Sequence, residues 1–211
     1  MLGIVVVGAP GAGKSTCCAA LARLMEAMHR PFAVVNLDPA NEDSLPYTAS
    51  IDVRALIRVE DVMERDGDAL GPNGALVFCM EFLEKHVDWL VDALGQLDPE
   101  TTVILDCPGQ VELYTHYHSV RNILSNLQRE GLVLCALQMF DVLWCADPST
   151  FISVLLTGLT TLMHLELPII SVLSKLDTLG KSVALRKSAS TISSNASYSL
   201  SYRILHRCAQ S

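Results

Sequence analysis

The sequence predicts a single α/β domain, a three-layer sandwich in which helices cover both faces of a mostly parallel sheet. Half of the 211 residues are hydrophobic, which is enough for one sizeable core. Short apolar runs rich in β-branched residues alternate with stretches of helical periodicity. Polar motifs directly follow the apolar runs, as in open sheets that bind ligands beyond the carboxyl ends of their strands.

The first element is a strand over residues 2–7, followed by a glycine-rich loop and an Ala/Leu-rich helix. Gly8 and Gly13 let the loop curl so that successive N–H groups point at one anion, and the helix adds the positive end of its dipole. Lys14 can then reach the β- and γ-phosphates of a nucleotide, and the Ser15 hydroxyl can ligate Mg²⁺. The order strand, loop, helix predicts a P-loop. The residues assigned to nucleotide binding are Gly11, Ala12, Gly13, Lys14, Ser15 and Thr16.

The same alternation continues to about residue 177. Apolar runs predict strands over residues 32–37, 102–105, 132–140 and 169–173. Helical spacing predicts helices over residues 16–29, 52–64, 75–84, 86–97, 114–129 and 149–165, the last with Ser149 as its N-cap. The composition of residues 66–74 is that of a turn.

One apolar stretch, residues 152–173, is long enough to span a bilayer. His164, Glu166 and Pro168 interrupt it, so a buried helix followed by a buried parallel strand is the better prediction. No signal peptide is expected either, because no basic segment precedes the apolar N-terminus. We therefore expect no membrane partner.

The charge is unevenly distributed along the chain. All 23 acidic residues lie at or before Asp177, and the last 34 residues carry five basic groups and no acidic one. An acidic body is a poor direct binder of nucleic acid. The seven cysteines show no metal-binding spacing, and their odd number argues against a disulfide framework. The cysteine usage predicts a protein of a reducing compartment, cytoplasmic or nuclear. The composition of residues 180–211 predicts a disordered Ser-rich tail.

A second polar motif follows the strand that ends at residue 105. Asp106 can hold Mg²⁺ directly or through water, the Gly109 N–H can meet the γ-phosphate, and Gln110 can orient the attacking water. The alternative is a polar turn at a strand end, which the upstream P-loop disfavours. Asp38 ends the second strand and can position the water or hold Mg²⁺ through water, although an Asx-turn before Pro39 explains it as well.

A third motif, residues 174–177, follows the last strand and fits a base reader. The Asp177 carboxylate can accept hydrogen bonds from the N1–H and the exocyclic amine of guanine, a donor pair that adenine lacks. The Lys175 stem can pack against the base. The residues assigned to the base are Ser174, Lys175, Leu176 and Asp177. Because strand ends of a parallel sheet share one edge, all these motifs are expected at one rim.

Taken together, the motifs resemble the GPN-loop GTPases, whose namesake insertion is matched by Gly71, Pro72 and Asn73. Residues 36–41, 106–112 and 147–152 also look like that family, and the likeness runs from about residue 3 to residue 177. The resemblance implies a P-loop NTPase fold, GTP binding and hydrolysis with Mg²⁺ and GTP/GDP, and a role in RNA polymerase II assembly and nuclear localisation. It also implies a homodimer or a heterodimer with other GPN-loop GTPases, in which the GPN loop of one subunit reaches the site of the other.

The resemblance also implies roles for single residues. Asn73, with Gly71 and Pro72, would bind the transferred phosphate; Gln110 and Glu112 would serve hydrolysis. The family continues past the base reader with a further strand, a loop on guanine and closing helices. Here a Ser-rich tail takes their place, so we expect a GTPase domain over residues 1–179 whose C-terminal part is missing.

Two other functions remain open at this point. The glycine loop also resembles that of adenylate-kinase-type phosphotransferases, but such enzymes need several arginines around the phosphates, and the chain offers chiefly Arg121 and Arg129. A non-catalytic scaffold, a truncated isoform that no longer turns over nucleotide, is the third possibility. Preference for GTP, preference for ATP and absence of binding separate the three.

Overall fold

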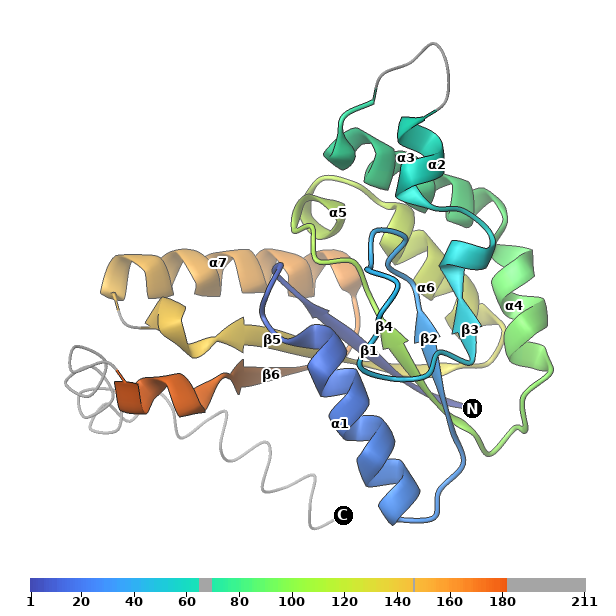
Figure 1. Ribbon diagram of the computed structural model, residues 1–211, viewed down its shortest axis with the longest axis horizontal. Coiled ribbons are helices and arrows are strands. Elements are labelled where there is room, and N and C mark those ends of the chain that lie inside the picture. The colour runs from blue at the N-terminus through green and yellow to red at the C-terminus, as the bar shows by residue number, and fades with distance from the viewer. Residues whose placement is uncertain (65–69, 146, 182–211) are drawn as a thin grey trace.

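The computed structural model describes residues 1–64, 70–145 and 147–181, which are built on one six-stranded sheet (Figure 1). The strands follow the order β3-β2-β4-β1-β5-β6, and every neighbouring pair is parallel. The predicted α/β fold is therefore confirmed. The strands are β1 Leu2–Gly8, β2 Phe32–Asn36, β3 Ile51–Asp52, β4 Thr102–Asp106, β5 Val133–Asp141 and β6 Ile169–Ser174.

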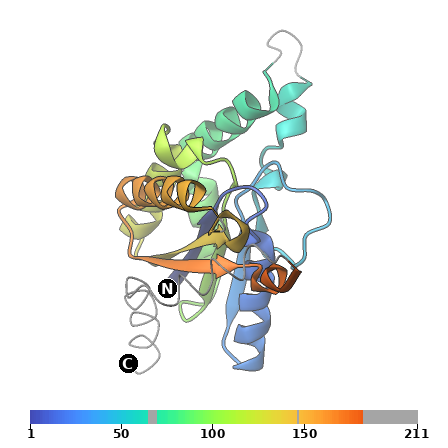
Figure 2. The same ribbon diagram turned by 90° about the vertical axis from the view of Figure 1, so that its left-hand side faces the viewer.

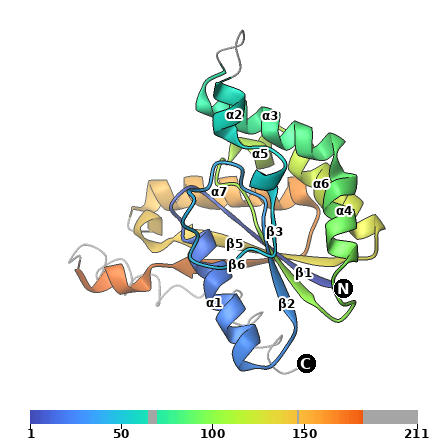
Figure 3. The same cartoon turned by 45° about the vertical axis from the view of Figure 1, so that its right-hand side comes forward.

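Helices cover both faces of the sheet and give it the expected three layers (Figure 2). The helix α1 (Lys14–Ala27) packs on one face. On the other lie α3 (Pro72–Lys85), α4 (Val87–Gly95), α6 (Ser119–Arg129) and α7 (Pro148–Leu165), as Figure 3 shows. The short helices are α2 (Val59–Met63) and α5 (Glu112–Thr115), with 3-10 turns at Val53–Ala55, Val142–Cys145 and Leu176–Lys181.

The central strands are apolar at successive positions because both of their faces are covered. Val6 of β1 packs toward α1, whereas its neighbours Val5 and Val7 pack toward the larger helical layer. In the register of the sheet, Val6 pairs with Asp106 of β4, and Gly8 pairs with Met139 of β5. The loops that follow β1 and β4 therefore leave the sheet side by side.

The helix predicted over residues 52–64 is wrong in its first half. Ile51 and Asp52 form β3, which pairs with the end of β2, and a 3-10 turn follows. The Asp52 side chain caps this turn by accepting a hydrogen bond from the Arg54 N–H. The apolar residues here have the spacing of a helix. However, pairing with the edge of the sheet and the cap by Asp52 determine the local backbone conformation. Only Val59–Met63 is α-helical.

The predicted turn over residues 66–74 is wrong in its last three residues, because α3 begins at Pro72. Proline suits the first turn of a helix, where its missing N–H would have no partner. Residues 65–69 lie outside the described residues. The helix predicted over residues 114–129 is instead two helices, α5 and α6. The Tyr114 hydroxyl donates to the Pro108 carbonyl at 2.7 Å and ties α5 to the segment that follows β4.

The N-cap of α7 is Asp147 rather than the predicted Ser149. The Asp147 carboxylate accepts a hydrogen bond from the Thr150 N–H at 2.9 Å. A carboxylate can accept several donors at once and also suits the positive end of the helix, so it outcompetes a hydroxyl two residues later.

The helix and the parallel strand predicted over residues 152–173 are present as α7 and β6, but the prediction that both are buried is wrong. The helix α7 rests on the sheet through one narrow side, where Gly158, Thr161 and Leu165 are buried. By length and composition it could also cross a membrane, but only 17% of that window is buried inside the structure. The strand β6 is the last of the described sheet and is only partly covered. The apolar side chains exposed on α7 are Ile152, Leu155, Leu156, Leu159, Leu162 and Met163.

The predicted tail falls almost entirely on residues 182–211, outside the described residues. A domain boundary at residue 179 stays a prediction.

Candidate functional site

The loop after β1 curls back over the start of α1. Gly8 and Gly13 have φ angles of 150° and 88°, which a side chain would disfavour, and Lys14 is the first residue of the helix. The Lys14 side chain is only 8% exposed, and its ammonium donates a long hydrogen bond of 3.4 Å to the Ala9 carbonyl. This geometry holds a cation inside the curl of the loop, beside the backbone N–H groups at the helix start.

The loop after β4 touches this ammonium. A Cβ atom on Gly109 would lie 2.8 Å from Lys14 Nζ and 3.1 Å from Pro10 Cα. No side chain fits at residue 109 while Lys14 keeps its place. The two motifs that the sequence places after β1 and β4 are therefore in direct contact.

A cavity of about 830 Å³ lies in front of these loops. It collects residues from the segments after β1, β2, β4 and β6 and from the start of α3, which are far apart in the sequence. The predicted site residues that line it are Gly11, Gly13, Lys14, Ser15, Thr16, Asp38, Asn73, Gly109, Gln110, Glu112 and Lys175.

The remaining predicted site residues do not line this cavity. Ala12 and Asp106 are buried behind it. Gly71 and Pro72 are exposed beside Asn73, and Leu176 and Asp177 are exposed beyond Lys175. Ser174 lies at the end of β6, where its hydroxyl donates to the Phe140 carbonyl at 3.0 Å. The cavity also includes residues that the motifs did not single out, namely Pro10, Ala40, Asn41, Leu76 and Val111.

The pKa of Asp38 reflects the meeting of these loops. Burial raises the pKa of its carboxyl group; the Ala40 N–H, the Lys14 ammonium and the Gly109 N–H oppose the rise, and the Asp106 charge adds to it. The Ala40 N–H donates to Asp38 Oδ1 at 3.0 Å. The Asp38 carboxyl group therefore interacts electrostatically with both the P-loop lysine and the loop after β4.

The chain resembles known proteins in both sequence and structure. A family described as "Conserved hypothetical ATP binding protein" matches residues 6–202. The chain is 48% identical over 175 residues to GPN-loop GTPase 2 of Danio rerio, covering 83% of this chain and 55% of that protein. It is 45% identical over 181 residues to GPN-loop GTPase QQT1 of Arabidopsis thaliana, covering 85% and 60%. A solved GTPase in apo form from Pyrococcus abyssi superimposes with a TM-score of 0.72 at 27% identity, covering 85% of this chain and 69% of the other.

This chain belongs to the GPN-loop GTPase family. It spans only 55–60% of the length of the two curated relatives.

The GPN tripeptide of this family member sits at the start of α3. Asn73 lies in the first turn of the helix and lines the cavity of its own chain, together with Leu76 one turn later. Gly71 has extended backbone, and Pro72 fixes the first helical residue. The tripeptide therefore sets the direction of an exposed amide side chain at the mouth of the cavity.

Behind the cavity, Asp106 has one satisfied oxygen and one orphan. The Tyr47 hydroxyl donates to Oδ2 at 2.7 Å, whereas Oδ1 is buried and has no hydrogen-bond partner among the described residues. Gln110 Oε1 is likewise buried without a partner there. Burial, then the Asp106 charge, raises the pKa of Tyr47, so its hydroxyl stays a donor.

The residues present fit a bound magnesium ion. Mg²⁺ prefers hydroxyl, carboxylate and water oxygens. Ser15 and Thr16 bring hydroxyl groups to the cavity, and the orphan oxygen of Asp106 is a buried acceptor that needs a partner. Ser15 and Asp106 would hold the ion, as the sequence predicts.

The predicted base reader is anchored to β5. Lys175 Nζ donates to Asp141 Oδ2 at 2.8 Å, and the Asp141 side chain is only 7% exposed. Burial raises the pKa of Asp141, but the hydrogen bonds from Lys175 and from the Leu143 N–H outweigh it, so its pKa lies below the usual value. Lys175 itself has a φ of 58°, a left-handed conformation that turns the chain out of β6 toward Asp177.

Sequence reasoning missed a polar network that fixes the segment around Asp38. Asn36 Oδ1 accepts hydrogen bonds from the Asp38 N–H and the Asn41 side chain, and Asn36 Nδ2 donates to Asp52. Arg54 binds Asp52 through two nitrogen atoms and also donates to the Glu42 carbonyl at 2.7 Å. The one available signal was a polar Asn36 at the end of a buried strand.

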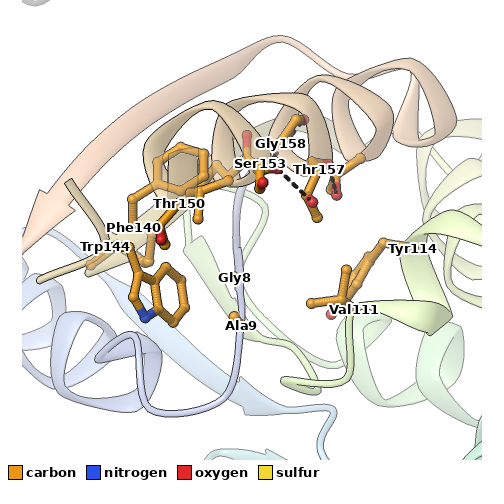
Figure 4. Close-up of a pocket in the computed structure, with 14 residues that line it drawn as sticks. Gly8, Ala9, Val111, Tyr114, Phe140, Trp144, Thr150, Ser153, Thr157 and Gly158 are labelled. Atoms are coloured by element: carbon orange, nitrogen blue, oxygen red, sulfur yellow. Dashed lines mark hydrogen bonds between the residues drawn. The ribbon is translucent and has the colours of Figure 1, made fainter. Parts of the chain in front are cut away.

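A second cavity of about 260 Å³ lies between α7 and the start of the P-loop. Figure 4 shows Val111 and Tyr114 facing Thr157 and the α7 helix across it, with Trp144 at one side. The hydroxyl groups of Ser153, Thr157 and Thr161 donate to carbonyls of α7 itself. These hydroxyl groups are therefore already satisfied, and the cavity is largely apolar.

Proposed function

We propose that this chain binds a guanine nucleotide with Mg²⁺ and hydrolyses GTP. The observation that carries the proposal is the meeting of Lys14, Asp38, Asn73 and Gln110 at one cavity of about 830 Å³. The cavity brings together two lysines, two carboxylates, three side-chain amides and a row of N–H groups, which is the chemistry that a triphosphate and an attacking water require.

Each side chain has a distinct role in this proposal. Lys14 and the N–H groups of residues 11–16 hold the β- and γ-phosphates. Gln110 and Asp38 orient the attacking water, and Asn73 donates its amide to the transferred phosphoryl group. Glu112 lies at the same wall. Magnesium, when bound, neutralises charge on the phosphate oxygens.

The alternative of a phosphotransferase loses support from the placement of the arginines. Arg121 is paired with Glu166, and Arg129 donates to Asn126. Neither residue lines the cavity, whose basic residues are Lys14 and Lys175. A kinase would need guanidinium groups around both donor and acceptor phosphates.

The deciding experiment is a parallel titration with fluorescent GTP and ATP analogues in the presence of Mg²⁺, followed by a GTP hydrolysis assay. Preference for the GTP analogue supports the proposal, and preference for the ATP analogue supports a phosphotransferase. No binding of either leaves a non-catalytic scaffold. Lys14→Ala should abolish binding with the fold intact by circular dichroism, and the exposed Lys85→Ala should bind normally.

We further infer from the family that the chain forms a homodimer, or a heterodimer with another GPN-loop GTPase, and assists RNA polymerase II assembly and nuclear localisation from the cytoplasm. Light scattering of the purified chain tests the dimer. A monomer at micromolar concentration, alone and mixed with a second family member, would contradict it. Co-purification from cell extract tests contact with the polymerase.

A further inference from the structure

Tyr47 connects the segment that contains Asp38 with Asp106 at the end of β4, which belong to two different sequence motifs. It lies in the segment between β2 and β3, the same segment that contains Asp38. Its ring packs against the core under α1, and its hydroxyl reaches Asp106 at the end of β4, 59 positions further along the chain. This O–H to oxygen contact of 2.7 Å therefore ties the Asp38 segment to the buried carboxylate, in addition to the backbone hydrogen bond from the Leu37 N–H to the Asp106 carbonyl at 2.8 Å.

That contact determines which way Asp106 faces. The Asp106 side chain is 1% exposed, so it cannot turn freely toward solvent. With Oδ2 engaged by Tyr47, only Oδ1 is left to accept another partner, and it has none in the described residues. A hydrogen bond from a hydroxyl group fixes the rotamer of the carboxylate, which is how outer partners orient metal-binding groups.

We propose that Tyr47 is a positioning residue, which aims the free oxygen of Asp106 at Mg²⁺ and ties the Asp38 segment to the occupied metal site. This inference rests on the proposed nucleotide function and adds to it a residue that no motif contains. It gives a role to the phenol that the irregular segment between β2 and β3 places against α1. The ring of Tyr47 packs against the core, and its hydroxyl group links the Asp38 segment to Asp106.

The variant Tyr47→Phe isolates the hydroxyl, because the ring and its packing remain. The full chain is titrated with MgCl₂ at fixed fluorescent GDP, and binding is also measured in EDTA. We expect the Mg²⁺ concentration for half-maximal binding to rise about tenfold, the loss typical of an outer partner of a metal site, with unchanged affinity in EDTA. The matched control is Tyr117→Phe, whose side chain is partly exposed, and it should behave as wild type.

Two results would overturn the proposal. One is an unchanged Mg²⁺ dependence in Tyr47→Phe. The other is an equal loss of affinity with and without Mg²⁺, which would mean that the hydroxyl only supports the fold.

A second measurement needs no nucleotide. The amides of Ala40 and Asn41, both bonded to Asp38, should exchange hydrogen faster in Tyr47→Phe than in wild type, whereas amides of α4 should not change. If the wild-type chain binds no nucleotide, the proposed function fails. The exchange measurement still tests whether the hydrogen bond between Tyr47 and Asp106 holds the Asp38 segment in place. Unchanged exchange at these amides would refute it.

Discussion

The ammonium of Lys14 and the α-carbon of Gly109 are packed so closely that a methyl group on Gly109 would stand 2.8 Å from the nitrogen. The same methyl group would meet Pro10 Cα at 3.1 Å. The lysine tip can swing away, whereas the backbone at Pro10 cannot. Contact between two loops thus depends on the smallest residue at one position.

Gly109→Ala should therefore displace Lys14 from its place in the P-loop. We expect nucleotide affinity to fall by about tenfold or more, with a loss of unfolding free energy of only about 1–2 kcal/mol, as in other overpacked sites. Fluorescent nucleotide titration and urea unfolding measure the two effects. Gly95→Ala is the control, because nothing lies within 4 Å of a Cβ built there. Normal affinity in Gly109→Ala would show that the loops can separate without cost.

Asp177→Asn should weaken binding of GTP but not of ATP. The change replaces a carboxylate oxygen with an amide group that cannot accept from both guanine donors. We expect a loss of about 10- to 100-fold for the GTP analogue, the range for a lost hydrogen bond to a charged group. The exposed Asp88→Asn serves as the control. An unchanged ratio of the two affinities would exclude Asp177 as the base reader.

Asp52→Asn should destabilise the folded chain near neutral pH. Arg54 donates from Nε and Nη2 to the two carboxylate oxygens of Asp52, at 3.0 and 2.6 Å. Losing charge-assisted hydrogen bonds of this kind costs about 2 kcal/mol. Urea unfolding of the variant, beside the exposed Asp92→Asn, measures the loss. A variant as stable as wild type would mean that the ion pair adds nothing.

The loss in Asp52→Asn should also depend on pH in one direction. Burial raises the pKa of Asp52, but the hydrogen bonds from Arg54 and Asn36 outweigh it, so the pKa in the folded state lies below the ordinary value of 3.8. The carboxylate therefore stabilises the fold fully above that value, and the stabilisation is lost as the pH falls through the folded-state pKa. The difference between wild type and variant should shrink only in that acidic range; a difference that shrank already between neutral pH and pH 5 would contradict this assignment.

Two neighbouring positions of α7 should respond very differently to substitution. Leu165 is 4% exposed and Met163 is 68% exposed. Leu165→Ala should lower the unfolding free energy by about 2–4 kcal/mol through lost burial and a cavity, whereas Met163→Gln should change it by less than about 0.5 kcal/mol. Urea unfolding of both variants provides the test. Equal destabilisation would indicate that the outer side of α7 is covered in solution.

The elements that sequence reasoning placed well are those fixed by local chemistry. The strand, the curled loop and the helix at Lys14 follow from adjacent residues, because glycine and the helix start determine that backbone without distant contacts. Parallel strands bring the later motifs to the same edge, so Asp38, Gln110 and Lys175 could be assigned to one cavity from their place after apolar runs.

The features that were missed depend on distant partners. Nothing next to Tyr47 in the sequence indicates that its hydroxyl meets Asp106. The pairing of Ile51 with Val35 overrides a spacing that favours a helix. Periodicity also could not show that α7 is exposed, since a helix that is apolar all round gives the same pattern whether one side or every side is covered. Asp177 remained outside the cavity because its loop leaves β6 through a left-handed residue.

The arrangement of α1 has a consequence for how the chain responds to its ligand. Among the described residues, α1 is the only α-helix packed on its face of the sheet, and the P-loop leads directly into its first turn (Figure 3). A ligand bound at that turn therefore also stabilises α1, the helix that covers this face of the sheet. Saturation with ligand should therefore protect the chain from thermolysin and raise its melting temperature in step with ligand concentration.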